Sequence, residues 1–205
     1  MDSIQPYRSL FAERGAATSF QPAAPAAYCA VTATKSIVLI GMMGAGKSSV
    51  GRALQRRTGL ARIDTDELVT SQFGISVAEI FKMHGEDKFR DAETEAIRKL
   101  APERPTIITT GGGAVLRREN VDLLKKLGTI FWLAADEGTL FERASRRDER
   151  PLLQNENPRE VFSKLLRERE TVYAAAADFR IETARKSHDE VANAILNKLE
   201  TVALQ

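Results

Sequence analysis

The chain has 205 residues, of which 43% are hydrophobic, and its 30 Lys and Arg against 28 Asp and Glu give a formal net charge of +2. This length can bury one sizeable core, and the near balance of charge predicts neither nucleic acid nor an anionic membrane as a partner. A single cysteine excludes an internal disulfide, and no apolar run approaches the roughly 18 residues of a membrane span, which favours a cytoplasmic protein acting on small molecules.

Residues 1–35 differ from the rest of the chain. They contain three prolines, many alanines and no apolar periodicity sustained over two helical turns, which predicts a mobile N-terminal extension. Asp2 and Glu13 flank no continuous apolar region, so a cleaved secretory peptide is not predicted. An organelle transit peptide stays an open alternative, because the segment is rich in Ala and contains Arg and Ser.

Short apolar runs then alternate with segments of helical period. The runs lie at 36–40, 61–64, 106–110, 129–134 and 178–182. Alternation of this kind is typical of an α/β fold with a parallel sheet covered on both faces, here in a single domain over 36–205. Trp132 lies inside one run and is predicted to be a core aromatic.

A glycine-rich turn follows the first run, and Gly41, Gly46, Lys47 and Ser48 satisfy the pattern G-x-x-x-x-G-K-[ST]. Gly41 and Gly44 permit backbone angles that let successive N–H groups converge on phosphate oxygens at a helix N-terminus. In this pattern the lysine reaches the terminal phosphates and the serine hydroxyl holds magnesium. The motif predicts nucleotide binding and leaves the reaction open.

The second run ends in "IDTDE", which places Asp64 and Asp66 where parallel strands deliver side chains to a ligand. Two carboxylates two residues apart point to the same side of an extended segment. One can serve magnesium and the other can meet an attacking hydroxyl, as phosphoryl transfer requires. The alternative is that one of them is the N-cap of the helix that follows.

Further polar groups are ambiguous when the residues are considered one at a time. Arg90 and Glu93, three residues apart in a predicted helix, have the spacing of an ordinary surface ion pair. The tract 111–113, three glycines, is either a flexible turn or a point of close ligand approach, and its place after the third run favours a ligand. The segment 142–160 is rich in arginine and is either a solvated loop or a source of groups that close over phosphates. The helical periodicity of the next segment does not by itself indicate a functional role for either Arg167 or Arg169.

Together, "GMMGAGKSS", "DTDE", "FRDAE", "TGGGAV", "RPLL" and "RERETVY" occur in this order over 36–205, and the chain thereby resembles the shikimate kinases. The resemblance implies a P-loop NTPase three-layer fold of the nucleoside-monophosphate-kinase type, with a five-stranded parallel sheet flanked by helices. It also implies a substrate-binding lobe at about 65–95, a lid at about 144–158, and a monomer. The implied reaction is magnesium-dependent phosphorylation of the shikimate 3-hydroxyl by ATP.

The resemblance also implies roles for particular residues. Asp66, Arg90, Gly112, Gly113 and Arg169 would contact shikimate, with Glu93 orienting Arg90, and Ser48 and Asp64 would serve magnesium. The ATP contacts would come from Gly44, Ala45, Gly46, Lys47, Ser48, Ser49, Arg147, Arg150 and Lys186. Lys47, Asp66 and Arg150 would be the catalytic groups. Arg143 and Arg146 remain alternatives to Arg147 for packing on adenine. The side chain of Lys186 could be solvated instead of contacting the nucleotide.

Two other classes of function compete. A gluconate-type kinase would keep the phosphate loop but has no need for both Arg90 and Arg169 beside the glycine tract. A regulatory NTPase would hydrolyse nucleotide or bind a partner without any small acceptor, and the chain has no guanine-specifying N-K-x-D segment. His84 and His188 have no metal-ligand spacing and are predicted to be surface or helix-end residues.

Overall fold

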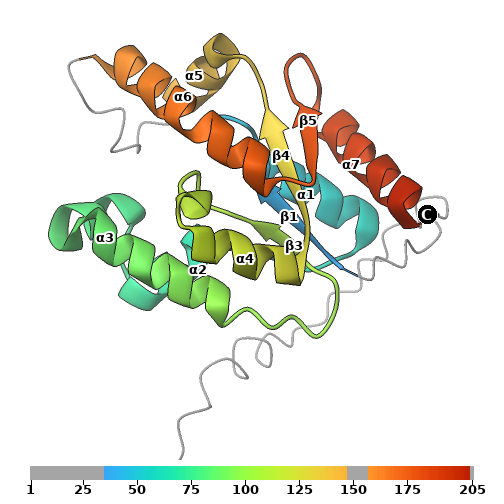
Figure 1. Ribbon diagram of the computed structural model, residues 1–205, viewed down its shortest axis with the longest axis horizontal. Helices are drawn as coiled ribbons and strands as arrows, with labels where there is room; N and C mark the ends of the chain where they lie inside the picture. The colour runs from blue at the N-terminus through green and yellow to red at the C-terminus, as the bar shows by residue number, and fades with distance from the viewer. Residues whose placement is uncertain (1–34, 147–156, 204–205) are drawn as a thin grey trace, which may run out of the picture.

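The computed structural model describes residues 35–146 and 157–203 (Figure 1). Apart from Lys35, the predicted N-terminal extension lies outside the described residues, and so does most of the predicted lid. The predicted sites Arg147 and Arg150 are among the residues that are not described.

A five-stranded sheet forms the centre of the molecule. Its strands are β1 (Ser36–Ile40), β2 (Arg62–Asp64), β3 (Ile107–Thr109), β4 (Gly128–Ala134) and β5 (Phe179–Glu182), in the order β2-β3-β1-β4-β5. Every neighbouring pair is parallel, which confirms the α/β prediction. The central strand is the one that leads into the phosphate-binding loop, so that loop lies in the middle of the carboxyl edge of the sheet.

Helices cover both faces of this sheet, as Figure 1 shows. They are α1 (Lys47–Thr58), α2 (Thr65–Phe73), α3 (Val77–Arg98), α4 (Arg118–Leu127), α5 (Glu137–Ser145), α6 (Pro158–Ala176) and α7 (His188–Ala203), with a 3₁₀ helix η2 (Ala114–Leu116). Helices α1 and α7 pack together on one face, and α4 and α6 lie on the other. The result is the three-layer arrangement expected when parallel strands alternate with helices.

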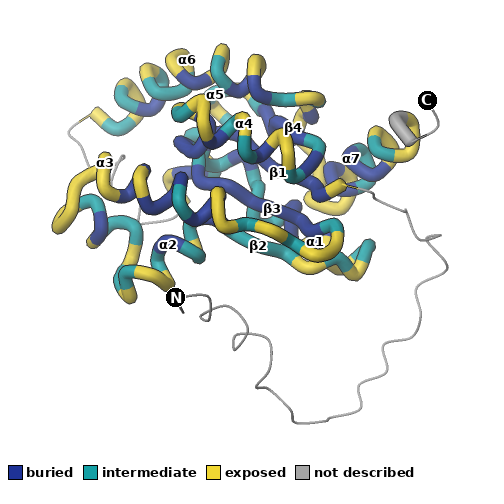
Figure 2. The backbone as a smooth tube through the Cα atoms, turned by 60° about the horizontal axis from the view of Figure 1, so that its bottom comes forward, coloured by how far each residue is buried: buried dark blue, intermediate teal, exposed yellow. Residues whose placement is uncertain are grey.

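The core lies between these layers. All five residues of β1 are buried, because the strand is covered on both faces, and the central strands appear dark blue in Figure 2. Trp132 is only 7% exposed and belongs to this core, which confirms its predicted role. Its ring stacks on that of Tyr173 of α6, with 6.0 Å between the ring centroids.

Helices α2 and α3 enclose a second, smaller hydrophobic cluster that contains Val69, Ile80 and Phe89. A capping box starts α3, in which Ser76 and Glu79 exchange hydrogen bonds. The helix is interrupted at Gly85, where φ is +81° and ψ is 165°. The cluster falls within the range predicted for a substrate-binding lobe, and that role remains a prediction.

Candidate active site

A cleft of about 800 Å³ opens at the carboxyl edge of the sheet. The phosphate-binding loop forms its floor, and α2, α3, the glycine tract, α6 and the loop before α7 form its walls. It brings together Gly44, Gly46, Lys47, Ser48, Ser49, Asp64, Asp66, Arg90, Gly112, Gly113, Arg169 and Lys186. Residues drawn from all along the sequence therefore line one cleft.

Two predicted residues lie behind the cleft wall. Ala45 is 1% exposed and packs in the main core, and its backbone N–H donates to the carbonyl oxygen of Met42 at 3.1 Å. Glu93 is fully buried beneath Arg90. The position of Glu93 is compatible with its predicted role in orienting Arg90, and the ATP contact predicted for Ala45 stays a prediction.

The phosphate-binding loop is held between β4 and α5. Gly41 and Gly44 have φ of +136° and +85°, which disfavour side chains. A Cβ on Gly41 would also lie 2.5 Å from the carbonyl oxygen of Leu133, and one on Gly44 would overlap that of Leu140. Glycine is thus required at both positions by conformation and by packing.

Lys47 extends from the first turn of α1 back over the loop. Its ammonium donates hydrogen bonds to the carbonyl oxygens of Gly41, at 2.7 Å, and Met42, at 3.2 Å. The positive charge therefore lies at the helix N-terminus, where the backbone N–H groups of α1 already favour an anion.

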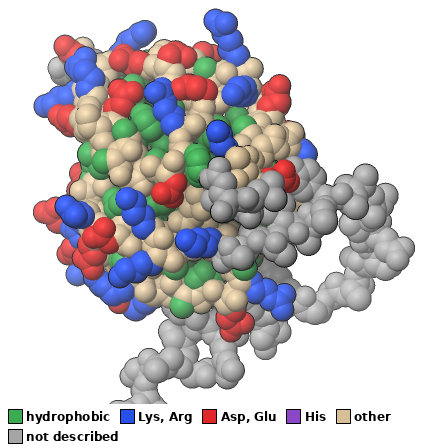
Figure 3. Space-filling model, turned by 45° about the vertical axis from the view of Figure 1, so that its right-hand side comes forward, with side chains coloured by type: hydrophobic (Ala, Val, Ile, Leu, Met, Phe, Trp, Pro, Cys, Tyr) green, Lys and Arg blue, Asp and Glu red, His purple; other side chains and the backbone are tan. Residues whose placement is uncertain are grey.

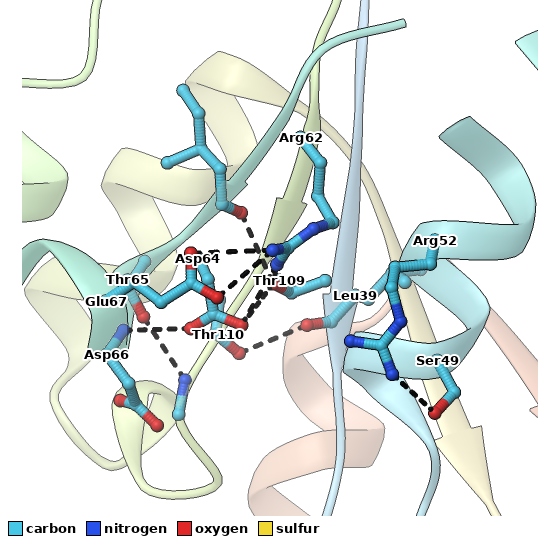
Figure 4. Close-up of polar contacts among 12 residues, drawn as sticks. Leu39, Ser49, Arg52, Arg62, Asp64, Thr65, Asp66, Glu67, Thr109 and Thr110 are labelled. Atoms are coloured by element: carbon cyan, nitrogen blue, oxygen red, sulfur yellow. Dashed lines mark hydrogen bonds and ion pairs between the residues drawn. The ribbon is translucent and has the colours of Figure 1, made fainter. Parts of the chain in front are cut away.

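Asp64 is both the last residue of β2 and the N-cap of α2. Its Oδ1 accepts a hydrogen bond from the Asp66 backbone N–H at 3.1 Å. Its Oδ2 accepts from Thr109 Oγ1 at 2.7 Å and from Arg62 Nη1 at 3.4 Å (Figure 4). The N-cap alternative is correct for Asp64, and the prediction that both aspartates project from an extended segment is wrong, because Asp66 lies in the first turn of α2.

Asp66 nevertheless reaches the same cleft. Its Oδ1 is buried with no hydrogen-bond partner among the described residues. Burial, reinforced by the negative charges of Glu93 and Asp64, raises the pKa of Asp66 to about 7. A carboxylate in this state is suited to meet a hydroxyl group of a ligand, which would supply the missing hydrogen bond.

The pair Arg90–Glu93 is a buried ion pair, so its interpretation as a surface pair is wrong. Arg90 is 8% exposed and its Nη1 donates to Glu93 Oε2 at 2.8 Å. Its Nε and Nη2 donate to Glu86 Oε1 at 3.2 and 2.9 Å, and the guanidinium lies 5.3 Å from the centroid of the Phe89 ring. Carboxylates and aromatic rings on its own helix therefore fix Arg90 at the cleft wall.

The glycine tract packs directly against these charged groups. A Cβ on Gly111 would lie 2.5 Å from Asp66 Oδ1 and 2.8 Å from Glu93 Oε1, and one on Gly113 would overlap the guanidinium of Arg90. At Gly112 the nearest atom to such a Cβ is the backbone nitrogen of Met43, at 3.5 Å. The tract is glycine because side chains at either end would displace the charged groups of the cleft.

Helix α6 supplies the second buried arginine. Arg169 is 5% exposed, whereas Arg167 is exposed, so the structure separates two residues that periodicity left equivalent. The Nη1 atom of Arg169 lies 3.9 Å from the Cβ position of Gly112. Arg90 and Arg169 thus approach adjacent residues of the glycine tract from two different helices.

Several cleft residues were not among the predicted sites, namely Val77, Phe81, Phe89, Thr110 and His188, and the cleft also contains Arg143 and Arg146, the two alternatives to Arg147. Arg143 donates to the Oγ1 and the carbonyl oxygen of Thr183, at 3.2 and 3.1 Å, which joins α5 to the loop after β5. His188 is an exposed helix-end residue, as expected, but its imidazole Cδ2 lies 3.8 Å from the Cβ position of Gly46. No local sequence signal marks His188, because its place in the cleft depends on contacts between distant segments.

Ser48 and Asp64 fit a magnesium ion that is bound mainly by phosphates and water. The described residues contain no group of three or more His, Cys, Asp or Glu side chains able to cage a metal. Magnesium at nucleotide sites retains several waters and takes only one or two protein oxygens. Since both oxygens of Asp64 already accept hydrogen bonds, contact through water suits it better than direct ligation.

A parallel sheet of order β2-β3-β1-β4-β5, with a G-x-x-x-x-G-K-S loop between its central strand and a helix, defines a P-loop kinase fold. The cleft beside the loop adds two buried arginines and an aspartate with a buried carboxylate oxygen, which suit a small acidic acceptor.

Comparisons with known proteins identify which family of P-loop kinases the chain is similar to in sequence. A family model described as shikimate kinase matches residues 43–200. The shikimate kinase of Thermodesulfovibrio yellowstonii is 44% identical over 169 residues, which cover 82% of this chain and 97% of that protein. The chain belongs to the shikimate kinase family.

Solved structures agree with this assignment. A shikimate kinase from Acinetobacter baumannii in complex with shikimate has a TM-score of 0.79 and 33% identity, covering 83% of this chain and 96% of that one. A gluconokinase from Sinorhizobium meliloti 1021 has a TM-score of 0.53 and 21% identity, covering 82% and 93%, and shares the fold alone.

Proposed function

We propose that this protein transfers the γ-phosphoryl group of ATP to the 3-hydroxyl of shikimate, giving shikimate 3-phosphate and ADP for the synthesis of chorismate and aromatic amino acids. The observation that carries the proposal is the pair of buried guanidinium groups, Arg90 and Arg169, that approach the glycine tract beside the phosphate-binding loop.

Shikimate offers one carboxylate and three hydroxyl groups, and these match the groups of the cleft. Planar guanidinium groups recognise a carboxylate by paired hydrogen bonds, and two of them fix its direction. Arg90 is itself held by Glu86 and Glu93, so it would need little reorganisation on binding. Backbone atoms of Gly112 and Gly113 would complete the contact, because no side chain obstructs the approach.

With the carboxylate anchored, the ring presents one hydroxyl to the donor, and regioselectivity follows from placement. Asp66 orients this hydroxyl by accepting its hydrogen bond. A loose phosphoryl-transfer transition state needs little help from a base, so positioning is its main contribution. Lys47 and Arg150 stabilise the charge on the transferring group, and this electrostatic effect accounts for most of the rate enhancement.

The donor side follows from the loop. Gly44, Ala45, Gly46, Ser48 and Ser49 surround the phosphates with backbone N–H groups and hydroxyls, and Arg147 and Lys186 contact the nucleotide beyond them. Ser48 and, through water, Asp64 would hold magnesium, which supplies charge neutralisation at the β- and γ-phosphates. Loss of activity with EDTA and its recovery with added magnesium would test this assignment.

The protein acts as a monomer in the cytoplasm, where ATP is supplied, and does not bind nucleic acid. Among the described residues the only exposed large hydrophobic side chains are Met83 and Leu116, which supports the monomer. Acidic and basic side chains are interspersed over the face seen in Figure 3, which gives no single-sign patch there for a nucleic acid. No helix among residues 35–146 and 157–203 is long and apolar enough to cross a membrane.

The test is ADP release by the purified protein with MgATP, alone or with shikimate, gluconate or a nucleoside monophosphate as acceptor. We expect release that depends on shikimate and on none of the others. Release driven by another acceptor would refute the proposed substrate, and release that is independent of every acceptor would favour a regulatory NTPase.

A further inference from the structure

Tyr173 is a buried polar residue to which neither the family motifs nor the proposed mechanism assigns a role. It is 1% exposed, its ring stacks on Trp132, and its hydroxyl donates a hydrogen bond to the carbonyl oxygen of Gly112 at 2.5 Å. Burial raises the pKa of Tyr173 to about 12, so the hydroxyl keeps its proton at neutral pH and remains a donor.

The hydrogen bond completes the support of the glycine tract. The carbonyl of Gly111 accepts from the Ala114 N–H at 3.3 Å, and that of Gly113 accepts from the Leu116 N–H at 3.0 Å. These two bonds are local and belong to the turn into η2. The middle carbonyl is held instead by a side chain 61 positions away in the chain.

This contact joins three parts of the cleft. Tyr173 follows Arg169 by one helical turn, so both side chains lie on the same face of α6. The tyrosine hydroxyl also lies 3.9 Å from the sulfur of Met42 in the phosphate-binding loop. One turn of α6 therefore carries both Arg169, which lines the cleft, and Tyr173, which holds the backbone of Gly112 next to that arginine.

The hydroxyl also fixes the direction of a peptide group. Because the peptide between Gly112 and Gly113 is planar, holding its carbonyl oxygen against α6 also sets the direction of the Gly113 N–H. Both glycines line the cleft, and neither has a side chain that could lock its backbone by packing. Without the hydroxyl, Gly112 would lose its hydrogen bond to α6.

We propose that Tyr173 is a positioning residue for the acceptor: its hydroxyl holds the Gly112 carbonyl against α6 and so keeps the glycine tract at a fixed distance from Arg169. This inference rests on the proposed function, in which Arg169 and the tract bind the acceptor together. It implies that the hydroxyl governs acceptor binding and has less influence on the donor, because the glycines of the phosphate loop pack on the backbone of β4 and α5 and the tyrosine meets that loop only through the Met42 sulfur.

The test compares Tyr173→Phe with Phe162→Leu. The first variant removes one oxygen atom and keeps the ring that packs on Trp132. The second weakens the same helix elsewhere, since Phe162 is fully buried and packs on Phe141 with 5.5 Å between ring centroids. For both variants the KM of the acceptor, the KM of ATP, kcat and the melting temperature would be measured.

We expect Tyr173→Phe to raise the acceptor KM about tenfold, the loss typical of one buried hydrogen bond, while the ATP KM changes by less than about twofold. Phe162→Leu should lower the melting temperature and leave both KM values near those of the wild type. An unchanged acceptor KM in Tyr173→Phe would overturn the proposal, as would equal shifts in both KM values.

A second measurement uses Trp132, the only tryptophan in the chain. Its fluorescence should change as acceptor binds to the tract next to Tyr173, and the Kd from this titration should rise in Tyr173→Phe in parallel with the KM. Equal Kd values for variant and wild type would also overturn the proposal. The comparison uses whichever acceptor the wild type phosphorylates, so failure of shikimate itself would refute the proposed function separately.

Discussion

At the scale of single residues, the cleft stands out for its buried charges. Arg90, Arg169 and Glu93 are each less than a tenth exposed, and Asp66 has a buried oxygen without a partner. Burying charge and leaving polar atoms unpaired costs free energy of folding. Such groups are retained where a ligand supplies the missing partners, and this is the pattern expected of a binding site.

Arg169→Ala should raise the KM for shikimate far more than the KM for ATP. Loss of a charge-assisted hydrogen bond costs about 1.5 to 3 kcal/mol, which corresponds to roughly a tenfold to hundredfold increase. Steady-state kinetics with each substrate varied in turn would measure it. Arg167→Ala is the matched control, because Arg167 is exposed on the same helix and should give wild-type values. Equal effects on both substrates would argue against a carboxylate role for Arg169.

Asp66→Asn should stabilise the metal-free protein at pH 8 while lowering its activity. The pKa of Asp66 is raised from 3.8 to about 7, so above pH 7 the folded state carries a charge that it disfavours, at a cost on the order of a few kcal/mol. As the pH falls below 7 the folded wild type binds a proton that the unfolded chain does not, and this cost is relieved.

The advantage of Asp66→Asn should therefore shrink by about 2.5 kcal/mol between pH 8 and pH 5. Urea unfolding in EDTA at both values would measure it. Asp122→Asn, at an exposed position on α4, should show no such difference. If the free energies of unfolding of Asp66→Asn and wild type differ by the same amount at both pH values, the raised pKa of Asp66 is contradicted.

At the scale of elements, the glycine tract shows how a loop is shaped by what packs on it. Its first residue faces two carboxylates, its last faces a guanidinium, and the N–H of Gly111 donates to the buried Oγ1 of Thr65 at 3.2 Å. The tract thus connects β3 with α2, α3 and α6. A change in the backbone of the tract would therefore displace the groups that are proposed to bind the acceptor.

Gly113→Ala tests this connection. The new Cβ would overlap the guanidinium of Arg90, which cannot retreat without breaking its bonds to Glu86 and Glu93. We expect at least about a tenfold rise in the KM for shikimate and little change in that for ATP. Gly138→Ala in α5 is the control, since its Cβ would meet only Asp136 Oδ1 at 3.3 Å. Wild-type kinetics for Gly113→Ala would show that Arg90 is not held as described.

At the scale of the whole molecule, the strand order decides where donor and acceptor meet. Strand β1 carries the phosphate-binding loop, and its neighbour β3 leads into the glycine tract. Helices α2 and α3 stand on one side of the cleft and α5 and α6 on the other (Figure 1). Parallel strands bring these loops to the same edge of the sheet, although they are far apart in the sequence.

Closure of the cleft around both substrates should exclude water, so MgATP alone should be hydrolysed slowly. We expect ADP release without acceptor to be at least about a hundredfold slower than with saturating shikimate. Both rates would be measured in one coupled assay, with EDTA as the blank. Hydrolysis as fast without acceptor as with it would rule out this role for closure.

The fold and much of the cleft could be predicted from local patterns. The phosphate-binding loop joins a strand to the helix that directly follows it, and the strands alternate with helices, so neither feature depends on distant contacts. The ordered motifs also indicated Asp64, Asp66, Arg90, Gly112 and Arg169, all of which line the cleft. Their proposed roles await the experiments above.

The sequence by itself determined the strand, loop and helix that form the phosphate cradle and the parallel α/β architecture around it, because these follow from neighbours in the chain. Only the tertiary structure decided that Arg90 and Glu93 are buried, that Asp64 bonds to Thr109, and that Tyr173 holds Gly112. The spacing of three residues between Arg90 and Glu93 does not predict burial, because exposed and buried ion pairs on a helix have the same spacing. Burial and hydrogen bonding across 45 or 61 positions arise only when the layers pack together.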